Sequence, residues 1–219
     1  MKTYVITDIH GHYDLLNLAL TNIERREPGK IVFTGDYVDR GPQSRQVIER
    51  LMAGPPDGWE WKILAGNHDL WFLDVIRFNE HPSEWLTDCG GINTLRSYGF
   101  QKDTLQIDRR MVPKEHLDWI DTLPLYHLTD THVFVHACLD LTKTMKEQSE
   151  GMLTWGYWNG VDLPYGNRHI IHGHDSDPNG PLLLQNRTNL DCRTIQTGKL
   201  CVGVFEGPGG PKEVMEIKL

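Results

Sequence analysis

Short apolar runs alternate with polar clusters at the start of the chain, and they carry two different periods. Runs rich in β-branched and aromatic residues cover positions 2–7, 31–34 and 61–64, which predicts strands. A helix is predicted between the first two of these runs, and Pro28 and Gly29 mark its end. Apolar residues between the runs recur at helical spacing, at Leu15, Leu16, Ala19, Leu20, Ile23, Val47, Ile48 and Leu51. This order predicts two right-handed βαβ crossovers in a parallel sheet.

The pattern changes along the rest of the chain. Helical spacing continues at positions 70–78, 83–98 and 113–123, and we expect a small helical insertion at about 79–123. Strand-like runs then follow at 125–128, 132–136, 169–172, 181–185, 199–205 and 212–218. We therefore expect an α/β fold with two facing mixed β-sheets flanked by helices, in a single domain over residues 1–219.

Composition narrows the class of protein. A net charge of −8 and a pI near 5.7 disfavour a nucleic-acid partner, because binding through the phosphate backbone needs basic residues. No apolar run approaches the roughly 20 residues that a membrane helix needs, so we expect no membrane partner. The four cysteines are widely spaced, and no apolar signal region follows Met1. These features predict a cytoplasmic protein with free thiols.

Polar clusters stand where the predicted strands end, which is where open α/β sheets place their chemistry. Asp8 and His10 are two residues apart, so an extended strand end would point both toward one cation. Asp36 follows the next strand and offers two oxygens that could bridge two metal ions. Further oxygen and nitrogen ligands come from Asn67, His136 and His174. Ligands without thiolate suit Mn²⁺, Fe, Zn²⁺ or Mg²⁺.

Three further residues complete the predicted chemistry. Two metal ions about 3.5–4 Å apart can polarise a phosphoryl group and lower the pKa of a bound water for in-line attack by a metal-bound hydroxide. Arg40 can hold phosphate oxygens with its planar guanidinium. His68, with Asp39 holding its ring, becomes an imidazolium that can protonate the leaving oxygen. We therefore expect His68, Asp39 and Arg40 to be the catalytic residues.

These clusters together resemble a known family. Asp-x-His-Gly at 8–11, Gly-Asp-x-Val-Asp-Arg-Gly at 35–41 and Gly-Asn-His-Asp at 66–69 resemble the calcineurin-like metallophosphoesterases, specifically the phosphoprotein phosphatase branch. The resemblance covers nearly the whole chain and extends to bacterial and phage phosphatases and to the related diadenosine tetraphosphatases. It implies a four-layer αββα sandwich with two divalent metal ions, most readily Mn²⁺.

The resemblance also implies a role for each predicted ligand. Asp8, His10 and Asp36 would hold the first metal ion. The second ion would be held by Asp36, Asn67, His136 and His174.

Four features distinguish the chain from proteins that it resembles, one of which is Ala65, where eukaryotic relatives carry arginine before Gly-Asn-His. Ser176 stands where diesterases of the superfamily carry a further metal-binding histidine, which favours the phosphatase branch. Cys138 replaces a usual glycine, and we interpret it as a packed small residue rather than a redox switch. A second phosphate-binding arginine is missing from the segment 155–158, and Arg168 is one candidate to replace it.

Three functions remain open from the sequence. The leading one is a binuclear-metal-dependent phosphomonoesterase, a serine/threonine protein phosphatase whose partner is a phosphoprotein or phosphopeptide. The alternative is hydrolysis of diadenosine polyphosphates, which requires an adenine pocket that the sequence does not show. The third is a non-catalytic metal-binding scaffold, since a fold alone does not determine function.

Overall fold

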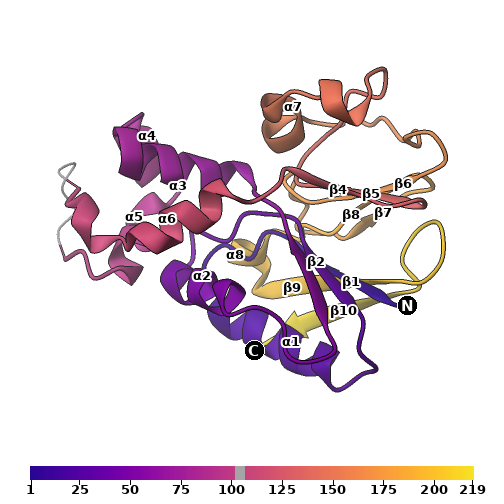
Figure 1. Cartoon of the computed structure of the whole chain (residues 1–219), viewed down its shortest axis with the longest axis horizontal. Coiled ribbons are helices and arrows are strands. Elements are labelled where there is room, and N and C mark those ends of the chain that lie inside the picture. Colours follow the sequence, from indigo (N-terminus) through magenta and orange to yellow (C-terminus); the bar gives the residue numbers. More distant parts are fainter. Residues whose placement is uncertain (102–106) are drawn as a thin grey trace.

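The computed structural model describes residues 1–101 and 107–219 and contains two five-stranded sheets. The first sheet has the strand order β10-β9-β1-β2-β3 and the second β4-β5-β6-β8-β7. Figure 1 shows the two sheets stacked, with α1 and α2 below the first sheet and α7 above the second. The expected αββα order of layers is confirmed.

The first sheet begins with the predicted βαβ units. Its parallel strands are β1 (Thr3–Ile6), β2 (Lys30–Phe33) and β3 (Glu60–Ile63), joined by α1 (Tyr13–Glu24) and α2 (Ser44–Met52). Two strands from the end of the chain, β9 (Lys199–Phe205) and β10 (Glu213–Lys218), join this sheet in antiparallel pairing beside β1. The strand patterns after residue 125 are therefore divided between both sheets.

The side chains of β1 point alternately to the two faces of the first sheet, and this explains how the layers are held together. Tyr4 and Ile6 pack with Leu16 and Leu20 of α1 on one face of the sheet. Val5, between them, points to the other face and packs with strand residues of the second sheet. Strands β1 and β2 are thus buried on both faces, which accounts for their continuous apolar runs in the sequence.

The second sheet contains β4 (Tyr126–Leu128), β5 (His132–Val135), β6 (His169–His172), β7 (Leu182–Leu183) and β8 (Arg187–Asn189). Its outer face packs on Leu153 of α7 (Glu150–Trp155). The sequence analysis did not find α7, β8 or α8 (Thr194–Thr197), because a helix of four to six residues and a three-residue strand carry too little periodicity.

The helical segment expected at about 79–123 follows α3 (Asn67–Phe78) and packs beside it (Figure 1). It contains α4 (Pro82–Thr87), α5 (Gly91–Ser97), a short 3-10 turn at Arg109–Met111 and α6 (Lys114–Asp121). A second 3-10 turn, Met145–Glu147, follows β5 and lies outside this segment. Gly90 breaks the predicted 83–98 helix into α4 and α5 with a left-handed φ of 76°. Residues 102–106 of the expected insertion lie outside the described residues. Among the helices that the structure describes, none is long and apolar enough to cross a membrane.

Candidate active site

The predicted site residues meet at one edge of the two sheets, where β1, β2, β3, β5 and β6 end. A cavity of about 300 Å³ opens there. It is lined by most of the predicted residues, namely Asp8, His10, Asp36, Arg40, Asn67, His68 and His174. Asp39 and His136 do not line it, but each is fully buried behind it and hydrogen-bonds to a lining residue. The structure therefore brings together every residue that the sequence motifs selected.

The loops that carry these residues have an unusual backbone. The expectation that Asp8 and His10 lie on an extended strand end is wrong, because β1 stops at Ile6 and their φ angles are 50° and 44°. Left-handed φ values recur at Asp36, Asp39, Arg40 and His174. Such conformations cost free energy in residues other than glycine. They are concentrated at functional sites, where surrounding contacts hold the backbone in place.

Hydrogen bonds hold the loops after β1 and β2 side by side. The backbone N–H of His10 donates to the carbonyl of Asp36 at 2.9 Å, and that of Asp8 donates to the carbonyl of Gly35 at 3.2 Å. Together these contacts fix the relative positions of Asp8, His10 and Asp36.

Asp69, in the first turn of α3, accepts hydrogen bonds from two loops of the site. Its carboxylate accepts backbone N–H groups from Asp36 and Tyr37 at 2.8 Å and from Gly66 at 2.9 Å. Gly66 itself admits no side chain, since a Cβ there would lie 2.2 Å from Oδ1 of Asp36. Asp69 therefore ties the loop of Asp36 to the loop that starts α3.

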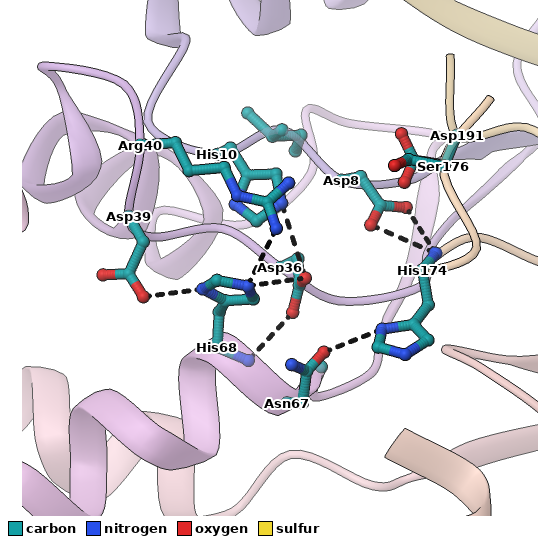
Figure 2. Close-up of polar contacts among 12 residues, drawn as sticks. Asp8, His10, Asp36, Asp39, Arg40, Asn67, His68, His174, Ser176 and Asp191 are labelled. Atoms are coloured by element: carbon teal, nitrogen blue, oxygen red, sulfur yellow. Dashed lines mark hydrogen bonds and ion pairs between the residues drawn. The ribbon is translucent and has the colours of Figure 1, made fainter. Parts of the chain in front are cut away.

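Asp36 lies at the centre of the candidate metal ligands (Figure 2). Its carboxylate belongs to two groups of possible ligand atoms, and in each group the atoms lie within 4.8 Å of one another. The first group also contains ring nitrogens of His10 and His68, and the second contains ring nitrogens of His136 and His174. Membership in both groups is what a bridging carboxylate requires.

The remaining ligands approach from either side of Asp36. Both oxygens of Asp8 accept the backbone N–H of His174, at 3.2 and 3.3 Å. Oδ1 of Asn67 lies 2.8 Å from Nε2 of His136 and 3.1 Å from Nδ1 of His174. Asp8 belongs to neither 4.8 Å group of imidazoles and carboxylates, although it lines the same cavity.

The chemistry of these donors fits divalent cations. Burial lowers the pKa of His10 and His136, and it lowers the pKa of His174 to about 4. The three rings are therefore neutral near pH 7, which is the form that binds metal. Nε2 of His10 and Nε2 of His174 are buried without a hydrogen-bond partner among the described residues. Buried imidazole nitrogens of this kind are costly unless a cation accepts their lone pairs.

His68 differs from those three histidines. Its Nδ1 lies 2.7 Å from Oδ2 of Asp39, and Nη2 of Arg40 donates to its Nε2 at 3.2 Å. Burial lowers the pKa of His68, but the nearby Asp36 carboxylate and the hydrogen bond to Asp39 outweigh burial and raise it. A histidine with a raised pKa keeps a proton to donate, whereas a metal ligand must give it up.

The helical segment supplies contacts to Asp39 that the sequence analysis did not assign. Trp85 Nε1 donates to Oδ2 of Asp39 at 2.8 Å, and Thr94 Oγ1 donates to Oδ1 at 2.7 Å. Burial raises the pKa of Asp39, and these hydrogen bonds together with the one to His68 oppose the rise. An indole and a hydroxyl spaced along a helical segment are ordinary packing residues in a sequence, so helical periodicity carries no signal for their contacts with Asp39.

Aromatic residues of the segment 155–158 form a wall beside the cavity. Trp155 and Tyr157 line the cavity, with ring centroids 6.1 Å and 5.1 Å from that of His174. Trp158 instead packs behind the wall and donates from Nε1 to the carbonyl of Ala137 at 2.9 Å. The wall is open to solvent, since Trp155 is 45% and Tyr157 57% exposed.

Two other sequence interpretations are also decided. Arg168 lies outside the cavity and donates from Nε to the carbonyl of Thr129 at 2.7 Å, so the suggestion that it binds phosphate is wrong. Cys138 is buried, and a Cβ on Gly156 would come within 2.7 Å of its own Cβ. It therefore packs as a small residue.

Comparisons with known proteins agree with this geometry. The family described as calcineurin-like phosphoesterase matches residues 1–192. A symmetrical bis(5'-nucleosyl)-tetraphosphatase of Janthinobacterium sp. is 33% identical over 138 residues, covering 63% of this chain and 43% of the relative. Serine/threonine-protein phosphatase T of Trypanosoma brucei brucei is 31% identical over 132 residues, covering 60% and 24%. The chain thus spans less than half the length of these curated relatives.

Solved structures share the fold. A crystal structure provisionally assigned as a diadenosine tetraphosphatase superposes with a TM-score of 0.69, at 19% identity, over 99% of this chain and 92% of the other. At that identity the likeness concerns the fold alone.

Proposed function

Because the chain belongs to the calcineurin-like phosphoesterase family of hydrolases, we propose that it is a metal-dependent phosphomonoesterase acting as a serine/threonine protein phosphatase. The observation that carries the proposal is the buried His68–Asp39 pair beside Arg40, at the edge of a group of neutral imidazoles around Asp36. A scaffold that only binds metal has no physical need for a proton donor and an arginine next to its ligands.

Asp8, His10 and Asp36 would hold one divalent cation, and Asp36, Asn67, His136 and His174 the other, with Mn²⁺ the metal that we propose. When bound, the pair would neutralise phosphate charge and supply the nucleophile at neutral pH.

The chain's own residues would perform the remaining steps. Arg40 is free of carboxylate contacts among the described residues, so its guanidinium can turn from Nε2 of His68 to the oxygens of a phosphate. That move leaves Nε2 of His68 open to hold a proton for the leaving oxygen. Asp39 keeps the ring oriented through Nδ1 and stabilises its positive charge.

A second candidate function is hydrolysis of dinucleoside polyphosphates. The exposed aromatic wall of Trp155 and Tyr157 favours it, because flat aromatic rings beside a phosphate site can stack on a nucleobase. Several bis(5'-nucleosyl)-tetraphosphatases are among the relatives, which supports the same candidate.

The deciding experiment compares substrates on one preparation. Metal-stripped protein is reconstituted with Mn²⁺, its metal content is measured, and turnover is followed on a phosphothreonine peptide and on diadenosine tetraphosphate. We expect higher kcat/KM on the peptide. Preference for the dinucleotide would replace the first proposal by the second, and bound metal without turnover on either would show a binding scaffold.

Two secondary expectations belong to this proposal. The four cysteines are all free thiols, which supports a reducing compartment such as the cytoplasm. Chelation is expected to abolish turnover, and restored Mn²⁺ to recover it.

A further inference from the structure

A second arginine faces the cavity from the side opposite Arg40. Arg193 follows β8 in the chain and lines the cavity together with Ser176. Its Nε donates to Oγ of Ser176 at 3.1 Å, and its Nη2 donates to the carbonyl of Ser176 at 3.0 Å. Figure 2 shows Arg40 beside His68 on one side of Asp36, and Ser176 beside Asp8 on the other. The guanidinium of Arg193 is therefore held on the Asp8 side.

The guanidinium of Arg193 forms no ion pair with a carboxylate among the described residues. Other arginines of the chain contact a carboxylate, as Arg26 does with Glu213 at 2.7 Å and Arg45 with Glu49 at 2.8 Å. Within residues 1–101 and 107–219, the guanidinium of Arg193 hydrogen-bonds only to Ser176 and Gln196, both neutral. An arginine with neutral partners at a polar cavity retains its capacity to bind an anion.

The backbone around Arg193 is built to present it. Its φ is 53°, in the left-handed region that the predicted site residues also occupy. The N–H of Arg193 donates to Oδ1 of Asp191 at 2.8 Å, and the N–H of Asp191 donates to Oδ1 of Asn189 at 2.9 Å. Asp191 and Asn189 are buried. A buried chain of hydrogen bonds thus fixes the turn that aims Arg193 into the cavity.

We infer that Arg193 is a specificity-determining residue that binds a phosphate oxygen from the side opposite Arg40 and selects phosphomonoesters over phosphodiesters. The inference rests on the proposed function for its site, and it assigns to Arg193 the role that Arg168 cannot fill.

The selectivity follows from the charge of the two ester classes. A phosphomonoester carries nearly two negative charges near pH 7 and has three non-bridging oxygens. A diester carries one charge, and its third oxygen bears a second organic group. Two guanidiniums on opposite sides of the cavity compensate the dianion and can reach the third oxygen of the monoester. In a diester that oxygen offers neither the charge nor the open position.

The test uses Arg193→Gln on Mn²⁺-loaded protein, with p-nitrophenyl phosphate, bis(p-nitrophenyl) phosphate and inorganic phosphate as probes. Losing a hydrogen bond to a charged group weakens binding roughly 10- to 100-fold. We expect KM for the monoester and the dissociation constant of inorganic phosphate both to rise by about that factor. We expect kcat/KM for the diester to change less than about threefold, because the lost contact is made to the third oxygen.

Three further variants sharpen the test. Arg193→Lys keeps the charge and should recover part of the phosphate affinity. Ser176→Ala should raise the phosphate dissociation constant by releasing the guanidinium. Arg110→Gln is the control, because this arginine is highly exposed, pairs with Asp108 and does not line the cavity.

Equal losses on monoester and diester, or unchanged phosphate affinity in Arg193→Gln, would overturn the inference. Phosphate affinity is measured by calorimetry without turnover, and metal content is measured on every variant. If the wild-type protein hydrolyses neither ester, the proposed function fails, while the calorimetric comparison still decides the role of Arg193.

Discussion

The substitution Asp39→Asn tests the assignment of His68 as proton donor. Oδ2 of Asp39 lies 2.7 Å from Nδ1 of His68, and both side chains are buried. A neighbouring opposite charge at such a distance raises a histidine pKa by about 1–3 units. Asp36 remains in the variant, with its Oδ2 3.9 Å from Nε2 of His68, so part of the rise should persist. We therefore expect the pKa of His68 to be lower in the variant than in the wild-type protein, because the hydrogen bond and the charge of Asp39 both raise it.

The sign of the effect on activity follows from the donor role. His68 acts in its protonated form, so activity is present below its raised pKa and is lost as the pH rises through that value. In the variant this loss should begin at a lower pH than in the wild-type protein. Above the pKa, each unit reduces the protonated fraction about tenfold. Alkyl phosphates, which have poor leaving groups, should therefore lose far more activity than p-nitrophenyl phosphate.

The assay is the pH dependence of kcat for both substrates on Mn²⁺-loaded protein. Because Trp85 and Thr94 lose a carboxylate partner, the variant should also unfold about 1–3 kcal/mol more easily, and assays belong well below its Tm. His68→Asn is the matched background, where adding Asp39→Asn should change kcat little. An unmoved alkaline limb, or equal losses on both substrates, would refute the donor assignment.

Three more outcomes are expected. Asp36→Asn should abolish turnover and reduce the bound Mn²⁺, as measured by elemental analysis, because its carboxylate alone belongs to both ligand groups. His68→Asn should retain both metal ions while slowing turnover of alkyl phosphates by about 10²–10⁴-fold, and a loss of metal would make His68 a ligand instead. His169 is buried with its pKa lowered from 6.5 to about 4, so the unfolded chain takes up its proton first as the pH falls. Stability should therefore decrease from about pH 6.5 to pH 4 by at most about 3 kcal/mol, and urea unfolding of His169→Gln should show a smaller decrease.

Sequence patterns were sufficient for the parts of the fold that depend on burial. The runs at β1 and β2 are apolar because both faces of each strand are buried, and the half-buried β3 keeps Trp61 and Ile63 against the core. The existence and the parallel order of these strands could therefore be predicted. The assignment of β9 and β10 to the first sheet could not. Antiparallel pairing beside β1 depends on contacts between residues about 200 positions apart, such as Thr3 with Phe205, which local periodicity does not encode.

The candidate site could likewise be predicted only in part. Motif spacing selected the residues that surround Asp36, because each directly follows a recognisable strand. It did not select Trp85 and Thr94, whose contacts with Asp39 span 46 and 55 positions. It also gave Asp8 and His10 an extended backbone that they do not have, because a left-handed φ outside glycine has no reliable sequence signal.

We therefore expect different roles for the two sets of residues at the cavity. Those at the strand ends concern metal binding, and those at the rim concern the choice of substrate. The candidate ligands around Asp36 are restricted by the chemistry of metal binding. The rim residues Trp155, Tyr157 and Arg193 come from α7 and from the turn after β8, which the sequence analysis missed. Their positions can change without moving a ligand, because they lie on the loops and short helices around the metal-binding edge. Substitutions at the rim should accordingly change which phosphoester is hydrolysed while leaving metal content unchanged, and substitutions around Asp36 should change both.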